Sequence, residues 1–188
     1  MTAKQIKERI FENEKDLVAL QKKLRRQKKK IVFTSGSFDL IHVGHTRYLE
    51  EAKRHGDVLV VGVSSNKAIQ KVKGPNKPVL DEKVRSEMLL YLRAVDYVVI
   101  LRQPSCLKAI MHLCPDIFIT VGEDWNQGCL ESPEAEAVRA GGGRVVVLKR
   151  QSPKISTTAI IDNIMARQIV KYFKQALDKN NGALKEHA

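Results

Sequence analysis

Residues 31–64 read IVFTSGSFDLIHVGHTRYLEEAKRHGDVLVVGVS, and this stretch decides the fold. It opens with a short apolar run, crosses a loop containing glycine and serine, continues as a helical pattern over 44–55, and ends in a second apolar run over 57–64. Apolar runs rich in β-branched residues and separated by a helix are typical of parallel strands in a sheet covered on both faces. The stretch therefore predicts a β-α-β unit.

The same alternation continues toward the C-terminus. The expected strands are 31–35, 57–64, 95–101, 116–121 and 144–149, and the expected helices are 44–55, 81–93, 105–113, 131–140 and 157–177. Crossovers between parallel strands are right-handed, so this order predicts an α/β fold. We expect a Rossmann-like, doubly wound parallel five-stranded sheet with helices on both faces.

Residues 3–27, which precede this pattern, also look helical. Ile10, Leu17 and Leu24 recur every seven residues, and the same face gains Ile6, Val18 and Leu20. So narrow an apolar stripe predicts a helix that docks against the body or a second subunit. We expect an N-terminal amphipathic basic helix over 1–29, a main domain over 30–178 and a flexible tail over 179–188.

Composition favours a soluble, cytoplasmic protein. Of 188 residues, 43% are hydrophobic and 29% are charged, and apolar runs such as 58–63 are too short to span a bilayer. The N-terminal sequence MTAKQIKERI has no apolar stretch behind its charges, so no secretory signal is expected. The three cysteines, Cys106, Cys114 and Cys129, lack metal-ligand spacing and are expected to be reduced thiols.

The net charge of +12 is unevenly distributed. Residues 1–30 hold 11 basic and 4 acidic side chains, a net of +7, which leaves +5 for the rest of the chain. The excess lies in KKLRRQKKK over 22–30. This run is either a contact for nucleic acid or anionic membrane, or a solvated helix end whose lysines the helix dipole favours. We prefer the solvated helix end. The modest positive charge of the rest of the chain suits an enzyme with polyanionic substrates.

Ligands of open α/β sheets bind at the carboxyl ends of the strands, which directs attention to the loop after the first strand. His42 and His45 lie three residues apart at a helix start, so both imidazoles can face one point. Unpaired N–H groups there form a phosphate site. We expect the surrounding binding residues to be Thr34, Ser35, Gly36, Ser37, Phe38 and Gly44, with Gly36 supplying a strained strand exit and Gly44 a close backbone approach.

Two imidazoles could donate hydrogen bonds to an α-phosphate as charge builds up during an in-line displacement. The alternatives are two surface histidines or a zinc site. Zinc lacks supporting ligands here, because no cysteine lies within sixty residues of the pair. His42 and His45 are therefore predicted to be catalytic.

Two motifs of this sequence resemble those of a known enzyme family. The stretch GSFDLIHVGH resembles the H-x-G-H motif of the cytidylyltransferase-like nucleotidyltransferase superfamily, and residues 155–158 resemble its I-S-T-T element. This resemblance implies that the main domain is a nucleotidyltransferase domain. It also implies that Ser156, Thr157 and Thr158 bind phosphates at the start of the last helix, where a hydroxyl can also cap the helix.

Further matches are implied by the same resemblance. KGPNKPVL over 73–80 resembles the family's lysine-bearing loop, so Lys71 or Lys73 is expected to reach phosphates as a catalytic group. Arg93 matches a site arginine of glycerol-phosphate cytidylyltransferases, whereas Arg85 is expected to anchor structure. Residues 122–125 resemble a G-D-D-W element, and from these Gly122 and Asp124 are expected at the site, while Trp125 could equally be a packing residue.

The subgroup that this chain resembles most is the heptose 1-phosphate adenylyltransferase domain. This chain departs from that group's usual sequence at TSGSFD, Ser64-Ser65-Asn66 and TVGEDW. The identity of the acceptor is therefore less certain than the nucleotidyl transfer. The resemblance implies a nucleoside triphosphate with Mg²⁺, a phosphorylated sugar or polyol, and a homodimer. The residues leave ATP and CTP both open, with a glycerol-3-phosphate-type cytidylyltransferase as the alternative.

Two readings from other classes remain. HVGH also resembles the H-I-G-H motif of class I aminoacyl-tRNA synthetases, and the basic 22–30 run would suit tRNA, but a K-M-S-K-S loop is missing and aromatic residues make up only 5%. A non-catalytic nucleotide sensor would share the fold. Nucleic acid is therefore an unexpected partner, and an enzyme is the preferred interpretation.

Overall fold

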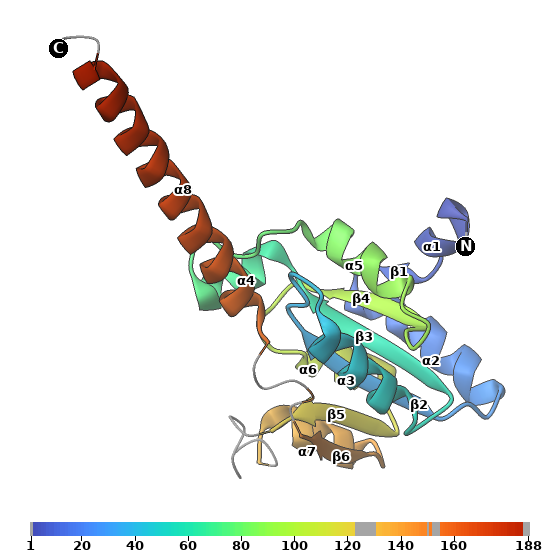
Figure 1. The fold of residues 1–188 in the computed structure, drawn as a ribbon. Coiled ribbons are helices and arrows are strands. Elements are labelled where there is room, and N and C mark those ends of the chain that lie inside the picture. Colours follow the sequence, from blue (N-terminus) through green and yellow to red (C-terminus); the bar gives the residue numbers. More distant parts are fainter. Residues whose placement is uncertain (1, 123–130, 150, 152–154, 186–188) are drawn as a thin grey trace. The chain divides into compact units, whose positions relative to one another are not determined.

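The apolar runs of the sequence pair side by side as parallel strands in the computed structural model, which describes residues 2–122, 131–149, 151 and 155–185 (Figure 1). The sheet has the order β1-β4-β3-β2-β5-β6. Its strands are β1 (Ile10–Phe11), β2 (Ile31–Gly36), β3 (Val58–Ser64), β4 (Tyr97–Leu101), β5 (Ile117–Val121) and β6 (Arg144–Leu148). The α/β Rossmann-like class is confirmed, and five of the six strands were predicted.

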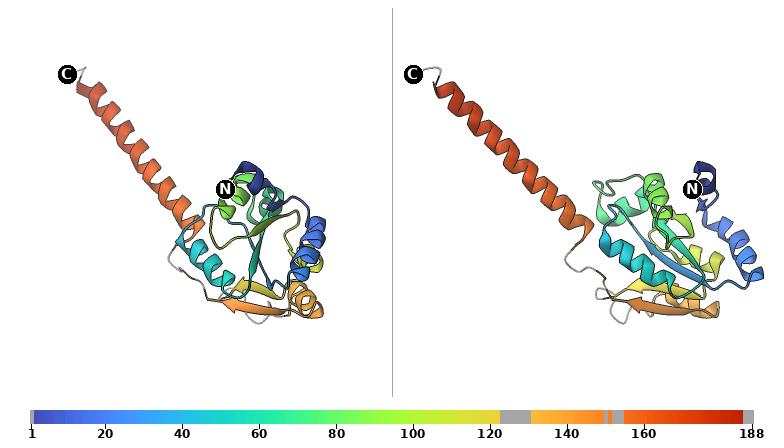
Figure 2. Two further views of the ribbon diagram at one scale, coloured as in Figure 1. Left: turned by 90° about the vertical axis from the view of Figure 1, so that its right-hand side faces the viewer. Right: turned by 45° about the vertical axis from the view of Figure 1, so that its right-hand side comes forward.

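Alternate side chains of each strand enter two separate cores, as the two-residue period of a strand requires. Val32 belongs to the core beneath α3 (Val43–Lys53) and α5 (Glu82–Leu90), whereas its neighbour Phe33 belongs to the opposite one. The second core lies beneath α2 (Leu17–Arg26), α6 (Leu107–Leu113) and α7 (Pro133–Ala140). Helices thus cover both faces of the sheet, as Figure 2 shows.

The N-terminal segment differs from the single helix predicted over 3–27. It forms α1 (Ala3–Lys7), the edge strand β1, a 3₁₀ turn η1 (Glu14–Asp16) and then α2. Pairing of Ile10 with Val98 and of Phe11 with Val99 adds a sixth strand, and the Arg9 guanidinium donates to the backbone oxygens of Val95 and Asp96. Hydrogen bonding to a distant strand here outweighs the helical periodicity of the segment.

The predicted apolar face of α2 exists, but it is used within the chain. Leu17, Leu20 and Leu24 are buried in the second core, where α2 packs against α6. That face is therefore not the subunit interface that the sequence left open as an alternative.

Two helices extend the predicted pattern. α4 (Asn66–Lys73) was not predicted; Ser65 begins it by accepting a hydrogen bond from the Ala68 backbone N–H at 3.2 Å. α8 (Thr157–Lys185) continues eight residues beyond the predicted end at 177. Contacts within the chain divide it into two compact units, Met1–Gln151 and Ser152–Ala188, and α8 belongs to the second. The boundaries at residues 29 and 178 and the flexible tail remain predictions.

Strand order reverses between β2 and β5, and this reversal positions the site. β3 and β4 follow β2 on one side, while β5 and β6 lie on the other. The crossovers leave in opposite directions at this point, which opens space at the carboxyl ends of β2 and β5. The loop that carries both histidines begins at the carboxyl end of β2.

Candidate active site

His42 begins α3 and its ring is oriented by the helix. It is the N-cap residue, with φ −137° and ψ 170°, and its Nδ1 accepts a hydrogen bond from the Gly44 backbone N–H at 3.2 Å. Since Nδ1 accepts, the neutral ring carries its hydrogen on Nε2. The ring of His45, one turn later, stacks on that of His42 with centroids 4.0 Å apart and planes 29° apart. The two predicted catalytic residues therefore form a pair.

Both imidazoles are neutral near pH 7. Burial lowers the pKa of His42, and burial, then His42, then Lys73 lower the pKa of His45 to about 4. His45 Nδ1 is buried without a hydrogen-bond partner. A hydrogen on that atom would leave a buried donor unpaired, so the tautomer with hydrogen on Nε2 is favoured. Each ring then offers an Nε2–H donor.

Phe38 holds His45 from a second side. Its ring is buried and meets His45 edge-on, with centroids 5.5 Å apart. The backbone strain of the loop lies at Phe38, whose φ is +44°, and not at Gly36, which the sequence had assigned to a strained strand exit. Gly36 is needed for space, because a Cβ there would lie 2.9 Å from the Phe38 ring.

Lys73, of the two predicted lysines, is the one placed beside the histidine loop. Its Nζ donates to Ser37 Oγ at 3.1 Å, and its charge contributes to the lowered pKa of His45. It occupies the last turn of α4, so it lies on a helix rather than in the expected loop. Lys71, which is exposed as Lys73 also is, lies two residues earlier, about 200° around the same helix. The structure therefore separates two lysines that the sequence left equivalent.

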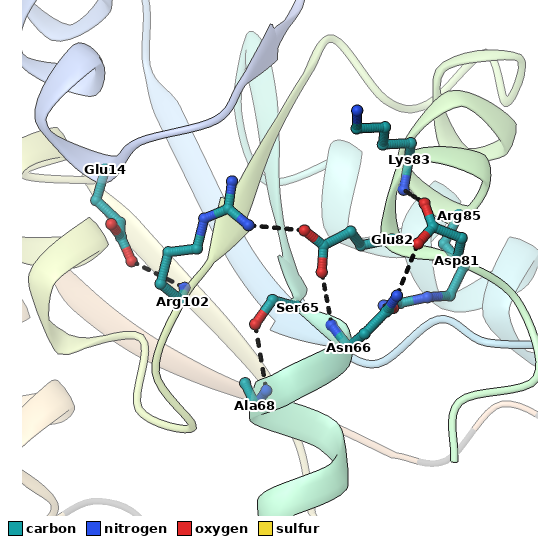
Figure 3. Close-up of polar contacts among 9 residues, drawn as sticks. All are labelled: Glu14, Ser65, Asn66, Ala68, Asp81, Glu82, Lys83, Arg85 and Arg102. Atoms are coloured by element: carbon teal, nitrogen blue, oxygen red, sulfur yellow. Dashed lines mark hydrogen bonds and ion pairs between the residues drawn. The ribbon is translucent and has the colours of Figure 1, made fainter. Parts of the chain in front are cut away.

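Asn66 fastens the start of α4 to α5 (Figure 3). Its backbone N–H donates to Glu82 Oε2 at 2.6 Å, its side-chain amide donates to Asp81 Oδ2 at 2.7 Å, and its Oδ1 accepts from Arg85 at 2.9 Å. Glu82 also pairs with Arg102, which follows β4, at 2.7 Å. One of the positions at which this chain departs from the heptose group's usual sequence is thus an asparagine whose backbone N–H and side chain are hydrogen-bonded within the protein.

Arg85 is the anchor that the sequence predicted. Its side chain is completely buried, and burial lowers its pKa. The guanidinium donates to the backbone oxygens of Leu80 and Ser37 as well as to Asn66. It therefore ties the lysine-bearing segment to the histidine loop at the residue that Lys73 contacts.

Asp39 is a site-shaping residue that the sequence analysis did not single out. It is almost fully buried, and its carboxylate accepts hydrogen bonds from the backbone N–H groups of Val79 and Leu80 at 2.9–3.0 Å. An aspartate three residues after β2, between the apolar Phe38 and Leu40, was the available signal. It fixes the 74–81 segment against the loop after β2.

Thr34 and Ser35 form the strand end beneath the loop. The Thr34 hydroxyl is buried and shares a 2.6 Å hydrogen bond with the Tyr48 hydroxyl, which donates to Ile119 O at 3.2 Å. Thr34 therefore joins β2, α3 and β5, and its hydroxyl already has a protein partner. Ser35 pairs with Gly62 in the sheet.

The remaining predicted residues, Arg93, Gly122 and Asp124, come from other parts of the chain. Arg93 precedes β4, at the amino edge of the sheet, where its exposed side chain pairs with Glu50 at 2.7 Å. This pairing raises the pKa of Arg93. Gly122 follows β5 at the carboxyl edge, and its N–H donates to Leu148 O at 3.1 Å. Asp124 and Trp125 lie outside the described residues.

The Ser-Thr element begins the second unit's helix. Ser156 Oγ accepts a hydrogen bond from the Ala159 backbone N–H at 3.1 Å, which is the expected capping contact. Thr157 and Thr158 are the first two residues of α8. The hydroxyls and N–H groups of a helix N-terminus are thus assembled within this unit as the sequence predicted.

Other classes of site gain no support from the structure. Within the described ranges, no three His, Cys, Asp or Glu side chains gather so as to hold a metal ion. Cys106 and Cys114 form no disulfide in that part of the chain, while Cys129 lies outside it. None of the helices described is long and apolar enough to cross a membrane.

Known proteins resemble this chain in sequence over the segment that contains the histidine pair. Residues 33–163, well over half of the chain, match the family model described as cytidylyltransferase-like. The bifunctional protein HldE of Syntrophotalea carbinolica is 38% identical over 163 residues, which are 85% of this chain and 31% of that protein. HldE of Geobacter metallireducens is 41% identical over 137 residues, or 73% and 27%. The chain thus spans about a third of the length of these relatives.

Solved structures show the same fold. A lipopolysaccharide core biosynthesis protein from Thermoplasma volcanium is 26% identical with a TM-score of 0.53, over 65% of this chain and 96% of that one. A pantoate-β-alanine ligase from Francisella tularensis, solved with an ATP analogue and β-alanine, is 16% identical with a TM-score of 0.52, over 74% and 66%. At this identity the ligase shows likeness of fold alone.

Proposed function

This chain belongs to the cytidylyltransferase-like family of nucleotidyltransferases, and we propose that it transfers a nucleotidyl group from a nucleoside triphosphate to a sugar or polyol phosphate. The single observation that carries the proposal is the stacked, neutral pair His42 and His45 at the start of α3, beside the reversal of strand order. Two neutral imidazoles and a helix N-terminus suit an anionic phosphate without needing a metal ligand set.

The reaction needs no protein nucleophile. An oxygen of the acceptor's phosphate attacks the α-phosphorus in line, a P–O bond forms, and the bond from the α-phosphorus to the bridging oxygen breaks to release pyrophosphate. The Nε2–H groups of His42 and His45 donate to the non-bridging α-phosphate oxygens, where charge accumulates. Lys73 neutralises phosphate charge, and Gly44 leaves space for the triphosphate.

Ser156, Thr157 and Thr158 hold the leaving pyrophosphate in this proposal. The support is chemical: a capped helix N-terminus supplies hydroxyls and backbone N–H groups suited to terminal phosphates. Mg²⁺ accompanies the triphosphate. Such ions are commonly held by substrate phosphates and water together with few protein ligands.

The preferred substrates are ATP and a heptose 1-phosphate. This choice rests on the resemblance to heptose 1-phosphate adenylyltransferase domains and on the relatives named HldE. The relatives do not favour the alternative pair, CTP with glycerol 3-phosphate. We also propose that the protein works in the cytoplasm as a homo-oligomer.

The proposal is tested by pyrophosphate release. Purified protein with Mg²⁺ and either ATP or CTP is offered heptose 1-phosphate, glycerol 3-phosphate, phosphoethanolamine and ribitol 5-phosphate. Release that requires one nucleotide and one acceptor identifies the pair. Absence of release with every pair would contradict the proposed substrate classes.

His45→Ala is the variant that tests the mechanism. Removing one donor of this kind is expected to lower turnover by about 10²–10³. The control is Thr46→Ala, one residue from His45. The Thr46 hydroxyl donates to the Val43 backbone oxygen. Near-normal turnover in a correctly folded His45→Ala protein would show that the histidine pair does not stabilise the transition state.

A further inference from the structure

Ser37, in the loop after β2 that carries both histidines, is contacted by Lys73. Its Oγ accepts a hydrogen bond from Lys73 Nζ at 3.1 Å. The sequence predicts that Ser37 is one of the residues around a phosphate site, whereas in the structure its hydroxyl oxygen is already used by a cation of the protein. The next residue is Phe38, whose ring meets that of His45. The contact therefore links the last turn of α4 to the histidine pair.

The partner of Lys73 is neutral, and this decides what the contact can do. Within the part of the chain that the structure describes, no carboxylate pairs with Lys73. A lysine ammonium has three N–H donors, so a hydroxyl that accepts from one of them leaves the positive charge and two donors available. A carboxylate in the same place would cancel that charge. Ser37 therefore holds the ammonium without reducing its attraction for phosphate.

Ser37 is itself held in place, so it can serve as a fixed point for a flexible side chain. The completely buried Arg85 guanidinium donates to the Ser37 backbone oxygen. Lys73, by contrast, is exposed, and fixing a lysine side chain costs conformational entropy because four rotatable bonds are restricted. A contact within the protein that already restricts them lowers the entropy that remains to be lost when the triphosphate binds.

We propose that Ser37 is a positioning residue for the transfer reaction, and that its hydroxyl holds Lys73 Nζ beside the histidine pair, ready for the triphosphate. Phosphate oxygens then accept hydrogen bonds from the two remaining donors of the ammonium. Ser37 acts through Lys73 and not by a phosphate contact of its own. This role rests on the proposed function, because it assigns Ser37 to the same reaction.

Steady-state kinetics provide the first test, with the nucleotide and acceptor that pyrophosphate release identifies. Ser37→Ala is expected to lower kcat/KM for the triphosphate by about three- to tenfold, which is the size expected for loss of one hydrogen bond. Ser37→Thr keeps a hydroxyl on the same carbon and is expected to restore kcat/KM to within about twofold of the wild-type value. An unchanged kcat/KM in Ser37→Ala would overturn the proposal.

A double-mutant cycle separates positioning from direct binding of phosphate by Ser37. When Ser37→Ala is added to Lys73→Met, kcat/KM is expected to fall by less than about a further twofold, because the side chain that Ser37 positions has already lost its ammonium group. A serine that bound phosphate by itself would make the two losses multiply. The full three- to tenfold loss in the Lys73→Met background, about as large as in the wild-type background, would therefore overturn the proposal.

An NMR titration of His45 provides a second readout that needs no turnover. After burial and His42, the charge of Lys73 is a further cause of the lowered pKa of His45. Release of Lys73 in Ser37→Ala is therefore expected to raise the pKa of His45 part of the way toward its value in Lys73→Met. An unchanged pKa of His45 in Ser37→Ala would overturn the proposal. If no substrate pair releases pyrophosphate, the proposed function fails, while this titration still decides whether Ser37 holds Lys73.

Discussion

His42 and His45 differ from two surface histidines because each is held by contacts of its own. The Gly44 N–H orients His42, and the Phe38 ring and the stacked His42 ring enclose His45. Burial disfavours the charged form of both rings, so near pH 7 they meet a phosphate as neutral donors. At the residue scale the two imidazoles therefore act as hydrogen-bond donors, and Lys73 supplies the positive charge beside them.

The lowered pKa of His45 predicts a dependence of stability on pH. The unfolded chain takes up a proton on this imidazole near pH 6.5, whereas the folded chain does so only near pH 4. The unfolded state binds more protons between these values, so the free energy of unfolding falls as the pH drops from about 6.5 to about 4. Above about pH 6.5 this contribution is constant.

Urea unfolding at a series of pH values measures this effect, with His45→Gln as the comparison. The wild-type chain is expected to lose stability more steeply than the variant over that window, because glutamine takes up no proton. Parallel curves for the two proteins would show that the pKa of His45 is not lowered by folding.

The two lysines of α4 provide a matched pair. Lys73→Met removes the charge that lies beside Ser37 and His45 and is expected to lower kcat/KM for the triphosphate by about 10–10³. Lys71→Met, two residues away on an exposed side of the helix, is expected to change kcat/KM less than about threefold. Steady-state kinetics decide between them, and equal losses would mean that α4 approaches the substrate with its other side.

At the scale of elements, α4, α5 and the loop after β2 act as one assembly. Asn66 and Glu82 join the starts of the two helices, and Arg85 joins both to Ser37. Asp39 holds the segment between the helices through the backbone of Val79 and Leu80. The position of Lys73 therefore depends on contacts at the opposite end of its helix.

Arg85 and Arg93 test this arrangement, since they lie eight residues apart and only one belongs to it. Lysine cannot reproduce the three directed bonds of the buried Arg85 guanidinium, so Arg85→Lys is expected to lower the free energy of unfolding by about 2–3 kcal/mol. Arg93→Lys alters an exposed ion pair and is expected to leave the free energy of unfolding almost unchanged. Chemical denaturation of both variants checks this, and equal values would argue against an anchoring role for Arg85.

At the scale of the whole molecule, the two units divide the work of the proposed reaction. Among the residues that the structure describes, both apolar cores draw their members from positions 6–148, all within Met1–Gln151. The second unit contributes α8, with the phosphate-binding hydroxyls proposed at its start. Folding of the sheet and completion of the site are therefore separable.

A chain ending at Gln151 tests that separation. Its denaturation midpoint is expected to stay close to that of the full protein, because no core residue is removed. Its pyrophosphate release is expected to fall by about 10² or more, since Ser156 and Thr157 are missing. Circular dichroism and the release assay make the two measurements, and a truncated chain that retains full turnover would exclude the proposed role of the Ser-Thr element.

The sequence by itself determined the features that depend on neighbours along the chain. The β-branched runs predicted five parallel strands, and the spacing of His42 and His45 predicted one shared direction, because helical geometry makes residues three apart neighbours. A cap at Ser156 or Thr157 was likewise predicted from local context, and the structure has it at Ser156. The family resemblance rested on these same local motifs.

Only the tertiary structure decided the features that depend on partners far along the chain. The edge strand Ile10–Phe11 forms through backbone pairing with β4, some ninety residues away, which a helical periodicity cannot reveal. Lys73 is distinguished from Lys71 by Ser37, and Thr34 is occupied by Tyr48, although all four residue types are ordinary phosphate ligands. Sequence periodicity indicates on which face of a helix or strand a side chain lies. Which residue that side chain contacts is determined only when distant elements pack together.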